Sequence, residues 1–163
     1  MTAESAWESE LAGFLTELSA VQDELFGVLK RKLSLLGTAD APGLDALSAV
    51  ELKLAERLQE CHGRRCALLE RAGREGLPAD SLRSLAAALP GRQRKQLQSQ
   101  VALAAEKSRL LQHQSLSNWV VTQRTLLHLS QLLEIIATGG KPRPTYGRED
   151  SVSSGGALLD RAV

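Results

Sequence analysis

The sequence is poor in aromatic residues, proline and cysteine. Aromatic side chains make up 3% of its 163 residues, and it holds 5 prolines and 2 cysteines. We expect the two cysteines to be small core or boundary residues that stay reduced in the cytoplasm. The excess of leucine and alanine favours helices, and the length corresponds to about one domain. We therefore expect an all-α protein.

Long apolar runs and targeting signals are also missing. Every apolar stretch is interrupted too soon to span a bilayer, and the start, MTAESAWESE, has neither the basic nor the apolar region of a secretory signal. A soluble, cytoplasmic protein without stable membrane insertion is expected. Amphipathic helices that lie on a lipid surface are an alternative, but the acidic first segment disfavours binding to anionic membranes.

Catalytic motifs are absent as well, since the sequence has no Walker loop, GxGxxG or HExxH. His113 and His128 have no neighbouring nucleophile or acid with which to form a catalytic pair. Cys61, His62 and Cys66 stand close together in CHGRRC, but spacings of one and five residues do not share a helix face, because side chains that meet lie three and four apart. We expect no enzymatic activity, no metal site and no cofactor.

The net charge of +1 conceals a separation of charge along the chain. Residues 2–40 carry seven acids and three bases, whereas residues 57–95 carry nine bases and four acids. This separation favours pairing between helices, and a surface for nucleic acid is the alternative. Because the bases are interleaved with acids and lack aromatic residues that stack on nucleobases, no nucleic acid partner is expected.

Apolar residues at helical spacing divide the chain into four segments. The predicted helices span about residues 3–36, 45–74, 79–89 and 92–137. The last would be roughly 70 Å long at ~1.5 Å per residue, more than a small core covers. We expect an all-α fold, an antiparallel helical bundle or coiled-coil hairpin with one very long C-terminal helix. The helical domain would comprise residues 1–139, and a flexible C-terminal tail residues 140–163.

The first two predicted helices each carry an apolar face for a neighbour. In the first helix the apolar spacings alternate between four and three, as in a coiled coil. Gly37 is expected to end this helix, Gly73 and Gly76 the second, and Asp80 or Ser81 to cap the third. The expected core positions are Trp7, Leu11, Phe14, Leu18, Val21, Leu25 and Val28 in the first helix, and Leu47, Val50, Leu54, Leu58, Cys61 and Leu68 in the second.

Two apolar rows run along the predicted long helix, and the first of them turns polar in its middle. Either the first two helices cover both rows, or one row forms a groove for an amphipathic partner helix. Buried Ser and Asn side chains would fix the helix register or bind polar groups of a partner. The first row comprises Leu97, Val101, Ala104, Ser108, Leu111, Ser115, Asn118, Thr122, Thr125, Leu129, Leu132 and Ile136, and the second Leu116, Trp119 or Val120, Leu126 or Leu127, and Leu133.

The last segment, GGKPRPTYGREDSVSSGGALLDRAV, differs in character from the rest of the chain. Its prolines and Gly147 keep it out of a helix, and its few apolar side chains include Tyr146 and the pair Leu158 and Leu159. Such a segment can order when it meets a partner, and an ordinary disordered terminus is the alternative.

This tail, together with LAERLQECHGRRCALLERAGREG in the second helix, resembles the FlgN family of flagellar type III export chaperones. The likeness lies in a Leu-rich helix that ends in Gly-Gly, the following TYG and the closing GALLDRAV. An acidic first helix, a basic second one, a short third and a very long last one extend it to the whole architecture. Family members often have an Asn pair followed by Gly on the long helix, where this chain has Asn118 followed by Trp119.

The resemblance implies a binding protein and not an enzyme. Such a protein would hold the terminal helices of hook-filament junction (hook-associated) proteins, prevent premature self-assembly and deliver them to the flagellar type III export apparatus. Tyr146, with Leu158 and Leu159, would contact the cytoplasmic domain of the export gate. The alternative is a structural coiled-coil adaptor or homodimeric scaffold without an export role, which allows a homo-oligomer. The expected client groove comprises Leu116, Trp119, Val120, Gln123, Leu127 and Leu133.

Overall fold

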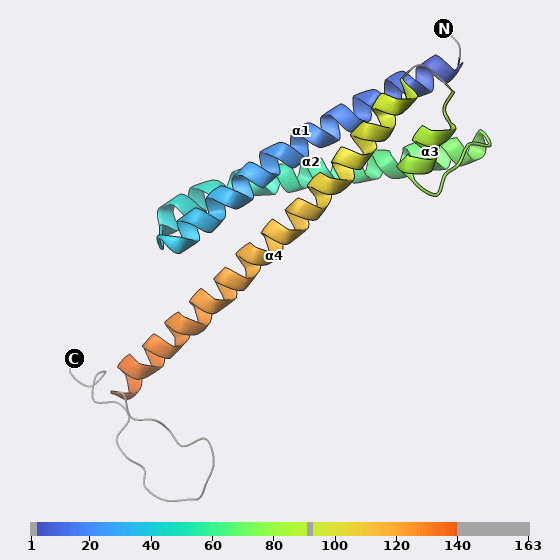
Figure 1. Cartoon of the computed structure of the whole chain (residues 1–163). Helices are drawn as coiled ribbons and strands as arrows, with labels where there is room; N and C mark the ends of the chain where they lie inside the picture. Colours follow the sequence, from blue (N-terminus) through green and yellow to red (C-terminus); the bar gives the residue numbers. More distant parts are fainter. Residues whose placement is uncertain (1–2, 91–92, 140–163) are drawn as a thin grey trace, which may run out of the picture. The chain divides into compact units, whose positions relative to one another are not determined.

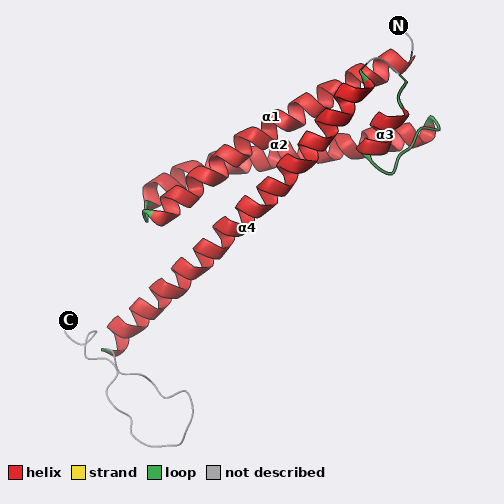
Figure 2. Cartoon of the chain, viewed as in Figure 1, coloured by secondary structure: helices red, strands yellow, loops and turns green. Residues whose placement is uncertain are grey.

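The computed structural model describes residues 3–90 and 93–139, and these residues form four helices joined by turns and loops. The helices are α1 (Ala3–Gly37), α2 (Ala41–Arg74), α3 (Leu82–Ala88) and α4 (Arg94–Thr138) (Figure 1). No strand occurs within the two described ranges, as Figure 2 shows. The predicted all-α class with one very long last helix is confirmed, and no predicted helix boundary is wrong by more than four residues. The expected tail, residues 140–163, lies outside the described residues.

The chain forms two compact units, residues 1–119 and 120–163. The first unit contains α1, α2, α3 and the part of α4 that ends at Trp119. The described part of the second unit is the remainder of α4 and Gly139. Among the described residues, no helix is both long enough and apolar enough to cross a membrane.

Capping interactions define both ends of α2. The Asp40 carboxylate accepts a hydrogen bond of 3.0 Å from the N–H of Gly43. A Cβ atom at residue 43 would lie 2.5 Å from Oδ2 of Asp40, so any larger residue there would displace the capping carboxylate. At the other end, Gly76 adopts a φ of +77°, and the N–H of Leu77 bonds back to the carbonyl of Ala72 at 2.8 Å. This arrangement satisfies a carbonyl of the last helical turn.

Ser81 caps α3, which confirms one of the two predicted caps. Its hydroxyl oxygen accepts a hydrogen bond of 3.1 Å from the N–H of Ser84. The Ser84 hydroxyl in turn donates to the carboxylate of Asp80, and this hydrogen bond lowers the pKa of Asp80. The short connector is thus held in place by its own polar side chains.

The core of the first unit consists of two apolar clusters. The prediction that Val50 is a core residue is wrong, because its side chain is 46% exposed. It lines a shallow hollow between α1 and α2 with Gly27, which has no side chain to cover it. The larger cluster joins all four helices through Trp7, Leu11, Phe14, Leu15, Val21, Cys61, Leu68, Ala72, Leu82, Leu85, Ala86, Leu89, Leu97, Val101 and Ala104. The smaller joins α1, α2 and α4 through Leu25, Leu29, Leu54 and Leu111.

Candidate functional site

A ladder of ion pairs joins α1 to α2. Glutamates recur every seven residues in α1 and arginines every seven in α2, so antiparallel packing places them opposite each other. Hydrogen bonds to the glutamates raise the pKa of the arginines Arg57 and Arg71. The charge separation along the sequence therefore pairs these two helices. The ladder consists of Glu10 with Arg71, Glu17 with Arg64 and Glu24 with Arg57, and Lys32 with Glu51 extends it.

An aromatic contact joins the start of α1 to the end of α2. The indole N–H of Trp7 donates a hydrogen bond of 2.7 Å to the carboxylate of Glu75. The guanidinium of Arg71 lies 4.1 Å from the centroid of the Trp7 ring, within the range of a cation–π interaction. Trp7 is thereby buried among apolar residues while its N–H remains paired.

Polar contacts set the register between α1 and the first part of α4. The amide N–H of Gln22 donates to the carbonyl of Ala104 at 3.1 Å and to the hydroxyl of Ser108 at 2.8 Å. Asn118 donates to the carbonyl of Leu29 at 2.8 Å. Gln22 pairs with residues 104 and 108, and Leu29, further along α1, pairs with residue 118, further along α4. The two helices therefore run parallel here.

The buried Gln22 and Asn118 thus fix the register between α1 and this part of α4. One of the two predictions for the polar centre, that buried Ser and Asn side chains fix the register, is confirmed for Asn118 and wrong for Ser108 and Ser115, which are exposed.

Within the first unit, the first apolar row of α4 is buried only in part. Leu97, Val101, Ala104, Leu111 and Asn118 are buried, as predicted. The carbonyl that receives the Asn118 amide belongs to α1, so the last buried residue of the row is polar and paired. The last buried contact of this row with α1 is therefore a hydrogen bond and not an apolar contact.

In the second unit the apolar members of the same row are exposed, whereas Thr122 and Thr125 are half-buried. Of the two alternatives for the rows, coverage of both by the first two helices is wrong for Leu129, Leu132 and Ile136, which are exposed. The described residues of this unit comprise a single helical stretch, which offers no second element against which an apolar face can pack. Exposure of these three side chains follows from the absence of such an element among the described residues of the unit.

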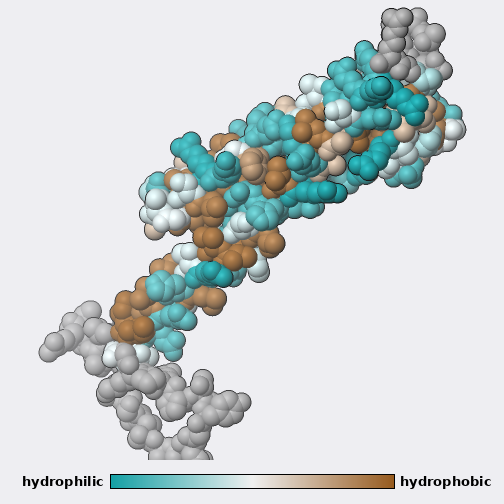
Figure 3. Space-filling view, in the orientation of Figure 1, coloured by the Kyte–Doolittle hydropathy of each residue, from teal (hydrophilic) through white to brown (hydrophobic). Residues whose placement is uncertain are grey.

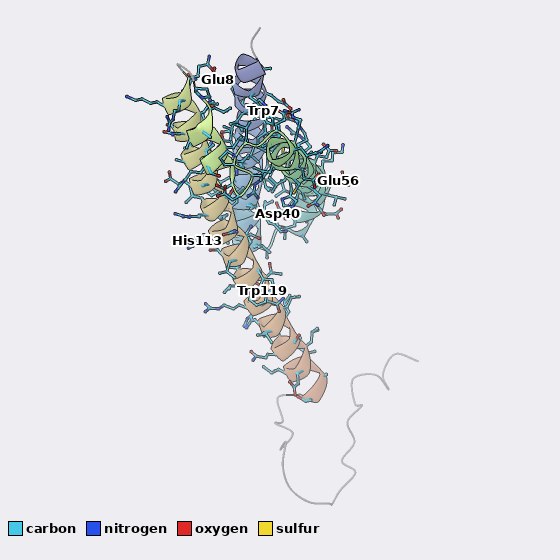
Figure 4. All side chains as sticks on the ribbon, turned by 90° about the vertical axis from the view of Figure 1, so that its right-hand side faces the viewer. Trp7, Glu8, Asp40, Glu56, His113 and Trp119 are labelled. Carbon is cyan, nitrogen blue, oxygen red and sulfur yellow. The ribbon has the colours of Figure 1, made fainter. Side chains whose placement is uncertain are left out.

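The six residues expected to form the client groove lie on α4, on both sides of the boundary between the units. Trp119 is 60% exposed and projects from α4 in Figure 4. Leu127 and Leu133 are 63% and 66% exposed, and Val120 is half-buried. Leu116 and Gln123 are also exposed. The members of the set in the second unit lie on a single helical stretch, and the role of the set as a client groove stays a prediction.

Sequence reasoning missed how far this exposed apolar surface extends. Apolar side chains project from more than one side of the stretch LLHLSQLLEII, residues 126–136, which contains one charged residue, Glu134. Figure 3 shows them gathered along this part of α4. The scarcity of charge in the sequence could have revealed it. We call this surface the α4 apolar face, and its residues are Leu126, Leu127, Leu129, Leu132, Leu133, Ile135 and Ile136.

A model of the FlgN protein family matches residues 1–154 of the chain. The chain belongs to the FlgN family. Membership implies a general role as a flagellar export chaperone, a class of binding proteins not known for catalysis. The predicted family resemblance is thus confirmed. Searches of curated proteins and of solved structures found no match.

The side chains that the FlgN resemblance assigns to the export gate lie outside the described residues. They are Tyr146, Leu158 and Leu159, and their role stays a prediction.

The thiol groups of this FlgN-family chain have contrasting surroundings. Cys61 is buried, and burial raises the pKa of its thiol. Cys66 is exposed, and its Sγ lies 3.8 Å from Nε2 of His62. The prediction that CHGRRC places no two of these side chains on one helix face is therefore wrong, because His62 and Cys66 are four residues apart. No group of three or more metal-ligating side chains occurs in the described part of the chain.

Proposed function

We propose that this FlgN-family protein is a cytoplasmic export chaperone for hook-associated proteins of the hook-filament junction. It binds their terminal helices, which prevents premature self-assembly, and delivers them to the flagellar type III export apparatus. The observation that supports this proposal is the α4 apolar face. The client helix lies along this face and along the neighbouring groove candidates Leu116, Trp119, Val120 and Gln123.

The reason is energetic. A helix that is apolar on more than one side is normally buried, whereas the leucines and isoleucines of the α4 apolar face are all at least two-fifths exposed. An amphipathic client helix covers such a face through anchors at helical spacing. Covering one half-exposed leucine contributes roughly 1 kcal/mol. Several anchors together offset the loss of freedom on association, so binding is specific yet reversible.

The proposal is tested by co-expressing the chain with the hook-filament junction proteins of its own source and measuring complex mass by size exclusion with light scattering. A defined complex that contains a monomeric client is expected. The double variant Leu127→Ala, Leu133→Ala should weaken client binding about tenfold or more, since ~1.4 kcal/mol corresponds to tenfold.

A matched control is available on the same helix. Leu103 and Leu110 are also about half-exposed leucines of α4, but they lie in the first unit, outside the α4 apolar face. The double variant Leu103→Ala, Leu110→Ala should bind the client as the unchanged chain does. An equal loss in both double variants, or none in either, would contradict the proposed site.

The division of labour between α4 and the tail is a further part of this proposal. Tyr146, Leu158 and Leu159 contact the cytoplasmic domain of the export gate while α4 holds the client. Tyr146→Ala should leave client affinity unchanged and reduce export in a secretion assay, and Tyr146→Phe, which keeps the ring, should retain most export. Parallel loss of client binding and export in Tyr146→Ala would contradict this division.

A homodimeric scaffold is the second candidate function, because the same α4 apolar face could pair with a second copy. It predicts a stable dimer of the chain alone, by light scattering, that takes up no client. A dimer that dissociates as the client binds would instead favour the chaperone.

A further inference from the structure

His62 and Cys66 lie one helical turn apart on the exposed face of α2. The distance between His62 Nε2 and Cys66 Sγ is 3.8 Å, and both side chains are exposed. Neither belongs to the ion-pair ladder or to the apolar core. Without a ligand, their contact is a weak hydrogen bond whose donor is set by the tautomer of the imidazole.

This separation fits two adjacent corners of a tetrahedral metal site. Zinc binds cysteine sulfur at about 2.3 Å and histidine nitrogen at about 2.0–2.1 Å. At the tetrahedral angle these bond lengths place the sulfur and the nitrogen about 3.6 Å apart. Small side-chain adjustments suffice to close the difference from 3.8 Å, so a metal ion can bridge the pair while α2 stays helical.

We propose that His62 and Cys66 form an exposed two-ligand site for zinc or a divalent cation of similar softness. A thiolate and an imidazole are ligands that such cations prefer. On binding, the Cys66 thiol releases its proton to the solvent, bonds from the metal to Sγ and Nε2 form, and water completes the coordination. No oxidation state changes. Because this site is independent of the α4 apolar face, it does not rest on the proposed client binding.

The surroundings explain why the site has two protein ligands and not three. Cys61 precedes His62 directly, but its side chain is 2% exposed and lies in the larger core cluster, away from the exposed pair. Arg65 stands three residues after His62 and its charge repels a cation, whereas Glu70 stands four residues after Cys66 and its charge attracts one. Affinity should therefore be well below that of a closed site with four protein ligands.

The proposal is tested on the untagged, full-length, reduced chain by titration with Co²⁺, followed by displacement with Zn²⁺. Coordination by the thiolate produces a sulfur-to-cobalt charge-transfer absorption, and it should saturate with one metal per chain and disappear when zinc is added. His62→Ala and Cys66→Ser should each weaken binding by at least about tenfold, since even loss of an outer-shell partner costs that much.

Two variants serve as controls for the loss of a cysteine or a histidine as such. Cys61→Ala removes the buried thiol and His113→Ala removes an exposed imidazole on α4, and both should bind cobalt like the unchanged chain. Absence of the sulfur-to-cobalt absorption would overturn the proposal. So would unchanged affinity in His62→Ala and Cys66→Ser, or loss of binding in Cys61→Ala.

Discussion

The two parts of α4 differ in how the apolar content of the sequence relates to burial. Residues 94–118 contain five charged side chains, yet their apolar row is buried against the other helices of the first unit. Residues 126–136 contain one charged side chain, and their leucines and isoleucines are exposed. The more apolar stretch is thus the more exposed one. Since an isolated apolar helix is costly in water, the contrast supports the proposal that this surface binds a client.

The largest expected difference is in the free energy of unfolding, between a change in the core and a change on the α4 apolar face. Phe14 is 1% exposed, and Phe14→Ala should lower the free energy of unfolding by about 3–5 kcal/mol, because it leaves a cavity. Leu127→Ala should change it by less than about 0.5 kcal/mol, since its side chain already contacts water. Urea unfolding followed by circular dichroism measures both. Similar losses in the two variants would mean that the α4 apolar face is part of the core.

A smaller effect should come from the polar layer that joins α1 to the first part of α4. Gln22 is 2% exposed, and Gln22→Ala removes its hydrogen bonds to Ala104 and Ser108. We expect a loss of about 1–3 kcal/mol in the free energy of unfolding. Gln112→Ala, on the exposed side of the same part of α4, is the matched control and should be nearly neutral. If Gln22→Ala lowered the free energy of unfolding no more than this nearly neutral control does, the buried layer would contribute no stability.

The ion-pair ladder should contribute less still. Glu17 and Arg64 are each about half-exposed, so solvent screens their attraction. A double-mutant cycle of Glu17→Gln and Arg64→Gln should give a coupling energy of about 0.2–1 kcal/mol that falls as salt is added. Coupling well above this range, or insensitive to salt, would mean that the ladder is effectively desolvated.

The smallest effect should distinguish the buried thiol from the exposed one. Burial raises the pKa of Cys61 in the folded chain, so the folded state holds its proton to higher pH than the unfolded state does. This contribution is fully present below the unfolded thiol pKa of about 8.5 and is lost as pH rises through the folded pKa. The fall in unfolding free energy above about pH 8.5 should therefore be shallower in Cys61→Ala than in Cys66→Ala. Identical pH profiles would contradict a perturbed Cys61.

Helices and caps could be predicted from the sequence because their signals are local. Apolar spacing predicted all four helices, and Ser81 was among the predicted caps. The charge separation also indicated pairing of helices, although it did not specify which side chains meet. The spacing of four between His62 and Cys66 was present in the sequence as well, and misreading it concealed their contact.

Other features depend on contacts between distant segments, which periodicity does not report. Gln22 interrupts no apolar row, and its burial follows from acceptors on α4 more than eighty residues away. The first row of α4 continues in phase from Asn118 to Ile136, so its pattern alone cannot show where coverage ends. Coverage requires a neighbouring helix, and the described second unit has none.

Hydrogen exchange of the chain, alone and bound to a hook-filament junction protein, tests the role of the α4 apolar face most directly. The measurement reports local opening along each helix. We predict that client binding slows exchange of the amides at residues 120–138, while exchange in α1 and α2 stays nearly unchanged. Protection confined to α1 and α2, or a stable complex with no change at residues 120–138, would contradict the assignment of this face to the client.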